Sequence, residues 1–471
     1  MRLILAGVLF LQVLILNAQE TQTQVLSYPE FLAYVKQYHP MVRQANLQLE
    51  MGEAELLKAR GAFDPKLEVD YSRKEFKGTE YYDVLNSTFK IPTWYGVELK
   101  AGFEQNKGAY LNPQRKVPPE GLFAAGVSLS IAQGLIMDKR RAALRSARAL
   151  KEQTEAEKNL MIAEVLFEAS LAYLNWARLQ KELEVYQEFV ANARQRSDGI
   201  GRSAAFGEIA AIDTVEAGIA LQERLLQLEQ TKVKLLKQKL EVSTFLWLDN
   251  NVPVELQPGT VPEVDFLQDE VLEVQTEKGV KNAIFEGHPK LRALEAKLKA
   301  LRVERRLKVN KLLPKIDLEY NFITPEPELI DYFDTSNYKA GLNVSFPLFL
   351  RKERGELKLA EYKIEDASLE LELNRRQIEN KVDGLMQELD SYVEQIRLTS
   401  EMVENYERLL NAEERKFSFG ESSLFLINSR ETKLIQARLK QTELFTKFLT
   451  TRAQLYRSLG VIPDVEAEIQ Q

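Results

Sequence analysis

The chain contains the same succession of sequence patterns twice. Its only two histidines, His39 and His288, are each followed by proline and lie 249 positions apart. The same distance separates Pro65 from Pro314, where the segments PKLEVDY and PKIDLEY match position by position. Because both histidines keep a fixed distance to a second matched feature, we interpret them as matched helix starts and expect neither to carry chemistry.

Three further pairs of segments match later in the chain, at offsets of 215, 213 and 213. They are GVSLSIAQ (126–133) with GLNVSFPL (341–348), RRAALRSA (140–147) with ERGELKLA (353–360), and RSAAFGE (202–208) with RKFSFGE (415–421). The constant offset of 213 leaves no insertion or deletion over that span. Solenoid units are only about 20–50 residues long, so we interpret the chain as a two-fold tandem duplication.

Within each copy the apolar pattern changes from helical to alternating. The stretch after each His-Pro pair predicts a helix with proline in its first turn. Apolar and polar residues then alternate, which predicts strands with one apolar face, in pairs at about 67–133 and about 315–350. The aromatic segment 81–105 is expected to form elongated strands with a large loop, the alternative being additional strands.

Long proline-free regions follow each strand pair. From Val382 to Leu410 apolar residues keep a spacing of three and four, which is typical of coiled-coil packing. Helical hairpins are therefore expected at about 140–248 and about 353–460, each turning at a glycine-containing segment. A helix from 141 to 203 would be about 90 Å long, far longer than a globular domain needs.

Composition excludes several classes of function. The net charge is only -7, and no basic run indicates nucleic-acid binding. The chain has no cysteine and two histidines, so we expect no disulfide, no metal site and no cofactor. We find no nucleophile–base pair and no glycine-rich phosphate loop, and predict that the protein is not an enzyme.

The N-terminus is expected to be a secretory signal peptide, residues 1–18. A single Arg2 precedes an apolar run that ends at Leu16 and is followed by Asn-Ala. The alternative, a membrane anchor, needs about 20 apolar residues. No later segment is expected to cross a membrane as a helix. Two strand pairs cannot close a barrel, which needs about eight strands, so a membrane barrel would require several chains.

The repeated order of helix, strand pair and long hairpin resembles the TolC-type outer membrane efflux proteins over nearly all of the mature sequence. The resemblance implies a homotrimer whose four strands per chain form a β-barrel in outer-membrane lipid, continued by an α-helical barrel in the periplasm of a Gram-negative bacterium. The duplication predicts a first repeat (19–248), a linker (249–287), a second repeat (288–460) and a tail (461–471). The resemblance implies that the linker forms a belt around the helical barrel. The expected function is an exit channel for efflux or type I secretion, partnered by a periplasmic adaptor and an inner-membrane pump. The alternative is a periplasmic coiled-coil adaptor or structural protein without a pore.

The resemblance also assigns candidate residues. At the tips of the hairpins, closure of the channel would involve Asp213, Phe417, Asn428 and Arg430, because Leu426 and Ser429 occupy the family's usual acidic positions of the second tip. The alternative for Asp213 is a solvated helix residue. Adaptor docking would involve Arg202, Phe206, Gly207 and Glu208 at the first tip, and Arg415, Phe419, Gly420 and Glu421 at the second. The alternative is that glycine only turns the chain and that phenylalanine packs the hairpin end.

Overall fold

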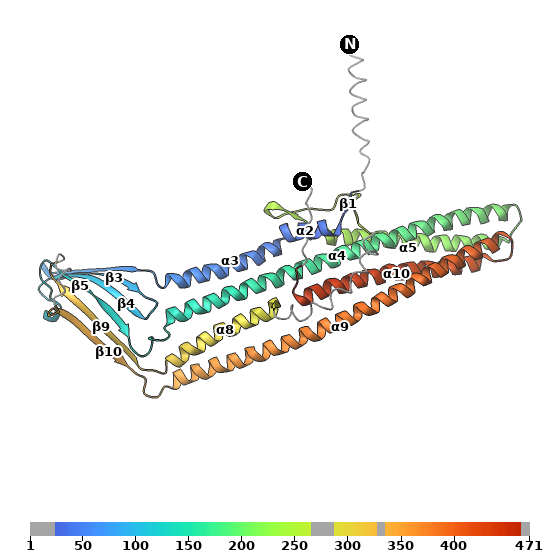
Figure 1. The fold of residues 1–471 in the computed structure, drawn as a ribbon. Helices are drawn as coiled ribbons and strands as arrows, with labels where there is room; N and C mark the ends of the chain where they lie inside the picture. Colours follow the sequence, from blue (N-terminus) through green and yellow to red (C-terminus); the bar gives the residue numbers. More distant parts are fainter. Residues whose placement is uncertain (1–23, 265–286, 327–334, 463–471) are drawn as a thin grey trace, which may run out of the picture. The chain divides into compact units, whose positions relative to one another are not determined.

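The computed structural model describes residues 24–264, 287–326 and 335–462 (Figure 1). The expected signal peptide 1–18, most of the linker and most of the tail therefore lie outside the described residues. The chain divides into two compact units. Of the described residues, the helical unit comprises 24–46, 158–264, 287–289 and 376–462, and the strand unit comprises 47–157, 290–326 and 335–375.

The strand unit contains one antiparallel sheet of six strands. In sheet order they are β10 (Tyr338–Ser345), β9 (Lys315–Thr324), β5 (Leu122–Ser130), β4 (Val97–Lys107), β3 (Thr79–Pro92) and β2 (Lys66–Phe76). The expectation of about four strands per chain was wrong, because segment 81–105 forms most of β3 and β4 rather than a large loop. Alternation continues through that segment, and a short turn at Lys77 and Gly78, both with positive φ, joins β2 to β3.

The register of the sheet gives it one apolar and one polar face. A row of directly paired residues runs through Leu67, Phe89, Ala101, Ala125, Phe322 and Tyr338. The next row on the other face runs through Lys66, Lys90, Lys100, Gly126, Asn321 and Lys339. Since side chains alternate between faces along each strand, the predicted alternation is confirmed across all six strands.

All four helices connect to the sheet at the same end of its strands. α3 (Pro40–Gly61) leads into β2, and α8 (Pro289–Asn310) leads into β9. α4 (Lys139–Ala205) follows β5, and α9 (Arg351–Ser418) follows β10. Within the strand unit these helices are joined by exposed ion pairs, such as Lys297 with Glu370 at 2.8 Å.

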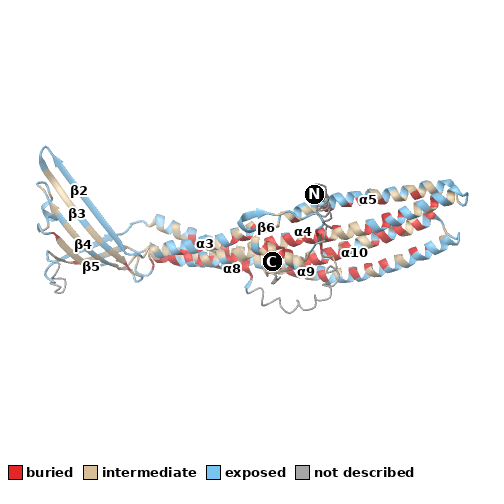
Figure 2. Ribbon diagram, turned by 90° about the horizontal axis from the view of Figure 1, so that it is seen from above, coloured by how far each residue is buried: buried red, intermediate tan, exposed pale blue. Residues whose placement is uncertain are grey.

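In the helical unit, α5 (Ala211–Ser243) returns alongside α4, and α10 (Leu424–Leu459) returns alongside α9 (Figure 1). The predicted stripe of α9 is buried, with Val382 and Leu389 each 1% exposed, and Trp176 of α4 is fully buried. Figure 2 shows buried positions concentrated on α4 and α10, whereas α5 is mostly exposed. This is the pattern of amphipathic helices that share one core.

One described helix is long and apolar enough to cross a membrane, contrary to the expectation from the sequence. It is α4, which contains such a window of 18 residues. That window is 61% buried, as expected for the central helix of a bundle.

Two segments that lie outside the hairpins, around Leu26 and around Val261, are attached to the helical unit by short strands and by a tyrosine. β1 (Val25–Leu26) pairs in parallel with β8 (Val261–Pro262), and β6 (Trp247–Leu248) pairs with β7 (Val252–Pro253). The Tyr173 hydroxyl of α4 donates to the Leu26 carbonyl at 2.6 Å and accepts from the Glu263 amide at 3.0 Å. Burial raises the pKa of this hydroxyl.

Both histidines lie directly before a helix. Nδ1 of His39 accepts from the Met41 amide at 3.3 Å in the first turn of α3, and its ring stacks on Phe245. His288 precedes α8, and its Nε2 lies 3.1 Å from the Ser458 carbonyl. Burial lowers the pKa of both imidazoles, so both are packed helix starts, as the spacing predicted.

Candidate functional site

Both hairpins turn through the same backbone motif. Gly207 follows α4 and Gly420 follows α9, each with a φ of 76°. The amide of Glu208 donates to a carbonyl five residues earlier at 3.0 Å, and the amide of Glu421 does the same at 2.9 Å. This is the Schellman motif, in which the left-handed position favours glycine because it has no Cβ. We call segments 206–210 and 419–423 the tip turns.

The predicted docking residues all lie at or just before the tip turns. Phe206 is 80% exposed and Phe419 is 78% exposed, so neither packs the end of its hairpin. The remaining members are exposed as well: Arg202, Gly207, Glu208, Arg415, Gly420 and Glu421. Exposed aromatic rings flanked by charges are suited to binding another protein.

A buried ion pair lies behind the tip turns. Nη1 of Arg196, on α4, donates to Oε2 of Glu431, on α10, at 2.8 Å, and Nη2 donates to Glu414, on α9, at 3.3 Å. The Glu431 side chain is only 1% exposed. Two charges this deep lose their hydration, and removing one partner of such a pair costs about 3–5 kcal/mol.

Polar side chains extend this ion pair to the fourth helix. Asn428 of α10 accepts from Arg196 at 3.4 Å and donates to Glu216 of α5 at 3.3 Å. Arg224 of α5, which is 7% exposed, donates to Thr432 of α10 at 2.7 Å. We call this set of seven residues the tip network: Arg196, Glu216, Arg224, Glu414, Asn428, Glu431 and Thr432. It connects α4, α5, α9 and α10.

The structure places the four candidate closure residues differently. Asn428 belongs to the tip network, and Nε of Arg430 lies 3.8 Å from Glu413. Phe417 is partly buried against the apolar cluster that contains Ile200. Asp213 is in the first turn of α5 and is partly exposed. Within the described residues its carboxylate has no side-chain hydrogen bond or ion pair.

Arg196 and Glu431 were missed from the sequence. Glu431 interrupts an apolar series that continues from Ile427 to Leu434 and Ile435. A carboxylate at such a position must be paired when the helix packs. That interruption is the signal that could have found it, although its partner lies 235 residues away in the chain.

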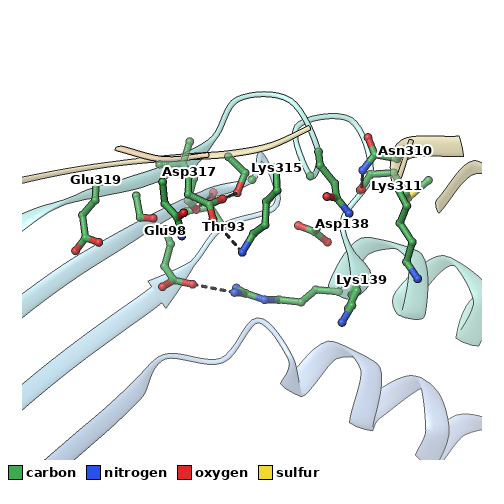
Figure 3. Close-up of a pocket in the computed structure, with 18 of the residues that line it drawn as sticks. Thr93, Glu98, Asp138, Lys139, Asn310, Lys311, Lys315, Asp317 and Glu319 are labelled. Atoms are coloured by element: carbon green, nitrogen blue, oxygen red, sulfur yellow. Dashed lines mark hydrogen bonds and ion pairs between the residues drawn. The ribbon is translucent and has the colours of Figure 1, made fainter. Parts of the chain in front are cut away.

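The strand unit has a polar hollow of about 810 Å³ where the strands meet the helices (Figure 3). Several of its charges are paired, including Arg140 with Glu98 at 2.8 Å and Lys315 with Asp317 at 3.0 Å. The Ser130 hydroxyl also donates to Asp317, at 2.6 Å. These groups form a charged wall on the polar face of the sheet.

Lysines at the rim of this hollow hold a helix–helix contact. Lys311, which lines it, donates to Glu356 of α9 at 2.9 Å, and Lys308 of α8 donates to the same carboxylate at 3.0 Å. These hydrogen bonds lower the pKa of Glu356 to about 2. Within residues 24–264, 287–326 and 335–462, no three histidine, aspartate or glutamate side chains are grouped to hold a metal ion.

Comparisons with known proteins agree with this architecture. Residues 282–461 match the family model of the outer membrane efflux protein. No curated protein sequence matches the chain.

Solved channels share the fold at low sequence identity. The CmeC outer membrane channel of Campylobacter jejuni is 12% identical, with a TM-score of 0.64 over 92% of this chain and 85% of its own. The MtrE outer membrane channel of Neisseria gonorrhoeae is 12% identical, with a TM-score of 0.64 over 92% and 88%. The outer membrane protein VceC of Vibrio cholerae is 14% identical, with a TM-score of 0.63 over 92% and 95%.

These channels match most of the chain, and the family model matches its second half. The predicted resemblance to the TolC-type outer membrane efflux proteins is therefore confirmed: residues 282–461 match the family model, and the fold is that of the solved channels.

Proposed function

We propose that the chain is one subunit of an outer-membrane exit channel that passes substrates from an inner-membrane pump and a periplasmic adaptor to the outside. The observation that carries this proposal is the combination of an open six-stranded sheet, which has an apolar band on one face, with two helical hairpins in a single chain. An apolar outer face with a polar inner face is the pattern of a membrane barrel. The channel fold and the efflux domain support the same function.

Exposed apolar stripes on the helical unit support a homotrimer. Five apolar residues of α5 recur every seventh position and are each more than half exposed: Ile212, Ile219, Leu226, Val233 and Leu240. α9 exposes Leu398, Met402 and Leu409, and the first two line a groove of about 530 Å³ with α10. A seven-residue repeat is the seam of a coiled coil. Each α5 is therefore proposed to pack against α9 of the next copy.

The tips are proposed to be closed in the resting channel and to dock the adaptor. The tip network fixes the two hairpins of one chain against each other, and Asp213 and Arg430 add polar groups beside it. The exposed Phe206 and Phe419 are the proposed contacts with the adaptor. Opening would either break the ion pair between Arg196 and Glu431 or move both hairpins together with the pair intact.

The division of the chain follows the same proposal. We propose a signal peptide at 1–18, repeats at 19–248 and 288–460 that arose by tandem duplication, a linker at 249–287 and a tail at 461–471. The described part of the linker lies against α5, where Lys239 donates to the Thr260 carbonyl at 2.9 Å, and against α4, where the Glu263 amide donates to the Tyr173 hydroxyl at 3.0 Å.

Cell fractionation tests the proposed function. The full chain, expressed in a Gram-negative host, is expected in the outer membrane as a trimer that is captured by cross-linking and forms pores in planar bilayers. Recovery as a soluble periplasmic monomer would favour the adaptor alternative. An outer-membrane protein that forms no pore would overturn the exit channel while leaving the location intact.

A further inference from the structure

The six-stranded sheet ends in two strands that lack a neighbour on one side. β2 pairs only with β3, and β10 pairs only with β9, within the described residues. All eleven residues of β2 and all eight of β10 are exposed. Unpaired amide and carbonyl groups at such an edge cannot face lipid, because no water is there to bind them. Each edge therefore needs a strand from another chain.

The directions of the two edge strands allow them to pair with each other. All five strand contacts in the sheet are antiparallel. In a series of six antiparallel strands the first and the last run in opposite directions. β2 of one copy and β10 of the next therefore extend the same antiparallel ladder.

The apolar face continues to both edges. On β2, Leu67 and Val69 are 67% and 61% exposed, and on β10, Leu342 and Val344 are 65% and 57% exposed. All four lie on the same face of the sheet as Phe89 and the rest of its row. A junction between β2 and β10 would thus join two lipid-facing surfaces without a break.

β2 and β3 are part of the sheet and not a separate hairpin. β3 pairs with β4 continuously from Asp83–Lys107 to Pro92–Glu98, and with β2 along nearly its whole length. The turn between β3 and β4 is fixed to the helical end of the sheet, where Trp94 stacks on Phe63 with ring centroids 4.2 Å apart. Neither edge of β4 is left free to receive a strand from another chain.

We propose that β2 of each copy pairs with β10 of the next, so that three copies of six strands close an eighteen-stranded barrel. This inference rests on the proposed trimeric channel and replaces the twelve-stranded barrel that four strands per chain would give. Barrel diameter grows roughly in proportion to strand number, and about 16–18 strands leave an aqueous channel. The polar face, with its ion pairs Lys100–Glu319 and Lys339–Glu104, would line that wide lumen.

Disulfide trapping tests this junction cleanly because the chain has no cysteine of its own. Asp70→Cys on β2 is combined in turn with Lys339→Cys, Gly341→Cys, Asn343→Cys and Ser345→Cys, which share one face of β10. A disulfide forms only where the two Cα atoms are about 4.4–6.8 Å apart. Oxidation in intact outer membranes is expected to give covalent dimers and trimers for one of these pairs and much weaker products for its neighbours.

The matched control replaces Asp70→Cys by Asn86→Cys, the residue paired with Asp70 on the interior strand β3. It is expected to give no interchain product with any β10 position. Products with Lys100→Cys on β4, and none with Asp70→Cys, would show a twelve-stranded barrel and overturn the proposal. Cross-linked products that never exceed a covalent dimer would also overturn the proposal, since two copies would then close the barrel. Outer-membrane trimers without any β2–β10 product sink this inference alone, whereas absence of the trimer sinks the proposed function as well.

Discussion

The first hairpin, α4 and α5, and the second, α9 and α10, turn through the same glycine motif, yet their facing sides carry different charges. The first hairpin contributes the cations Arg196 and Arg224 and one anion, Glu216, to the tip network, whereas the charged members from the second hairpin are both anions, Glu414 and Glu431. At the offset of 213 between the matched segments, Arg196 corresponds to leucine and Glu431 to glycine. The two turns are alike, whereas the two interiors carry complementary charges. In the proposed trimer, this complementarity would distinguish the contact within a chain from the contact between chains.

Arg196→Ala should have the largest effect on the contact between the two hairpins. It leaves the buried Glu431 carboxylate without its cation, which we expect to destabilise the helical unit by about 3–5 kcal/mol. Chemical denaturation of the purified channel measures this loss, and single-channel conductance should rise if the pair also restrains the tips.

Arg202→Ala is the matched control, because Arg202 is exposed on the same helix; its effect should stay within about 0.5 kcal/mol. The double variant Arg196→Met with Glu431→Leu should recover most of the stability, since an apolar pair can replace a buried ion pair. If the double variant is as unstable as Arg196→Ala, the unpaired carboxylate is not the cause.

The double variant Phe206→Ala with Phe419→Ala tests whether the tip turns bind the adaptor. Both rings are exposed, so the stability of the isolated channel should change by less than about 0.5 kcal/mol. Loss of exposed aromatic anchors at a protein interface typically costs about 2 kcal/mol or more. The affinity of the purified adaptor from the same organism, measured by surface plasmon resonance, should therefore fall at least about thirtyfold.

Tyr362→Ala on α9 provides the control, because this ring is 61% exposed and lies in the strand unit. It should leave adaptor binding unchanged. Equal loss from both sites would mean that the tip turns are not the docking surface.

Gly207→Ala and Gly420→Ala test whether the two turns are truly equivalent. Both glycines have a φ of 76° and open space where a Cβ would be, so only backbone strain opposes the change. Each substitution should cost about 1–2 kcal/mol, and the two costs should agree. Gly201→Ala within α4, also in open space, should instead stabilise by up to about 1 kcal/mol. Unequal costs at the two turns would show that their surroundings differ despite equal geometry.

Sequence patterns predicted the local elements well and the pairings poorly. The buried stripe from Val382 to Leu410 and the glycine turns follow from short-range spacing, which one chain segment carries by itself. The strand count failed because alternation in 81–105 does not say whether a segment is a loop or a further hairpin. Arg196 and Glu431 were not predicted, because each resembles an ordinary charged residue of a helix until the structure shows the two hairpins packed together.

Asp213→Ala should have only a small effect on stability, and it separates closure within a chain from closure between chains of the proposed trimer. An acidic residue in the first turn of a helix contributes only about 0.3–1 kcal/mol, and in the described residues Asp213 has no side-chain partner. If conductance in planar bilayers rises while stability is nearly unchanged, its partner must belong to a neighbouring copy. Asn428→Ala, by contrast, removes contacts within the chain to Arg196 and Glu216, and should lower stability together with any rise in conductance. Unchanged conductance for Asp213→Ala would leave closure to the tip network and to the charge difference between the two hairpins.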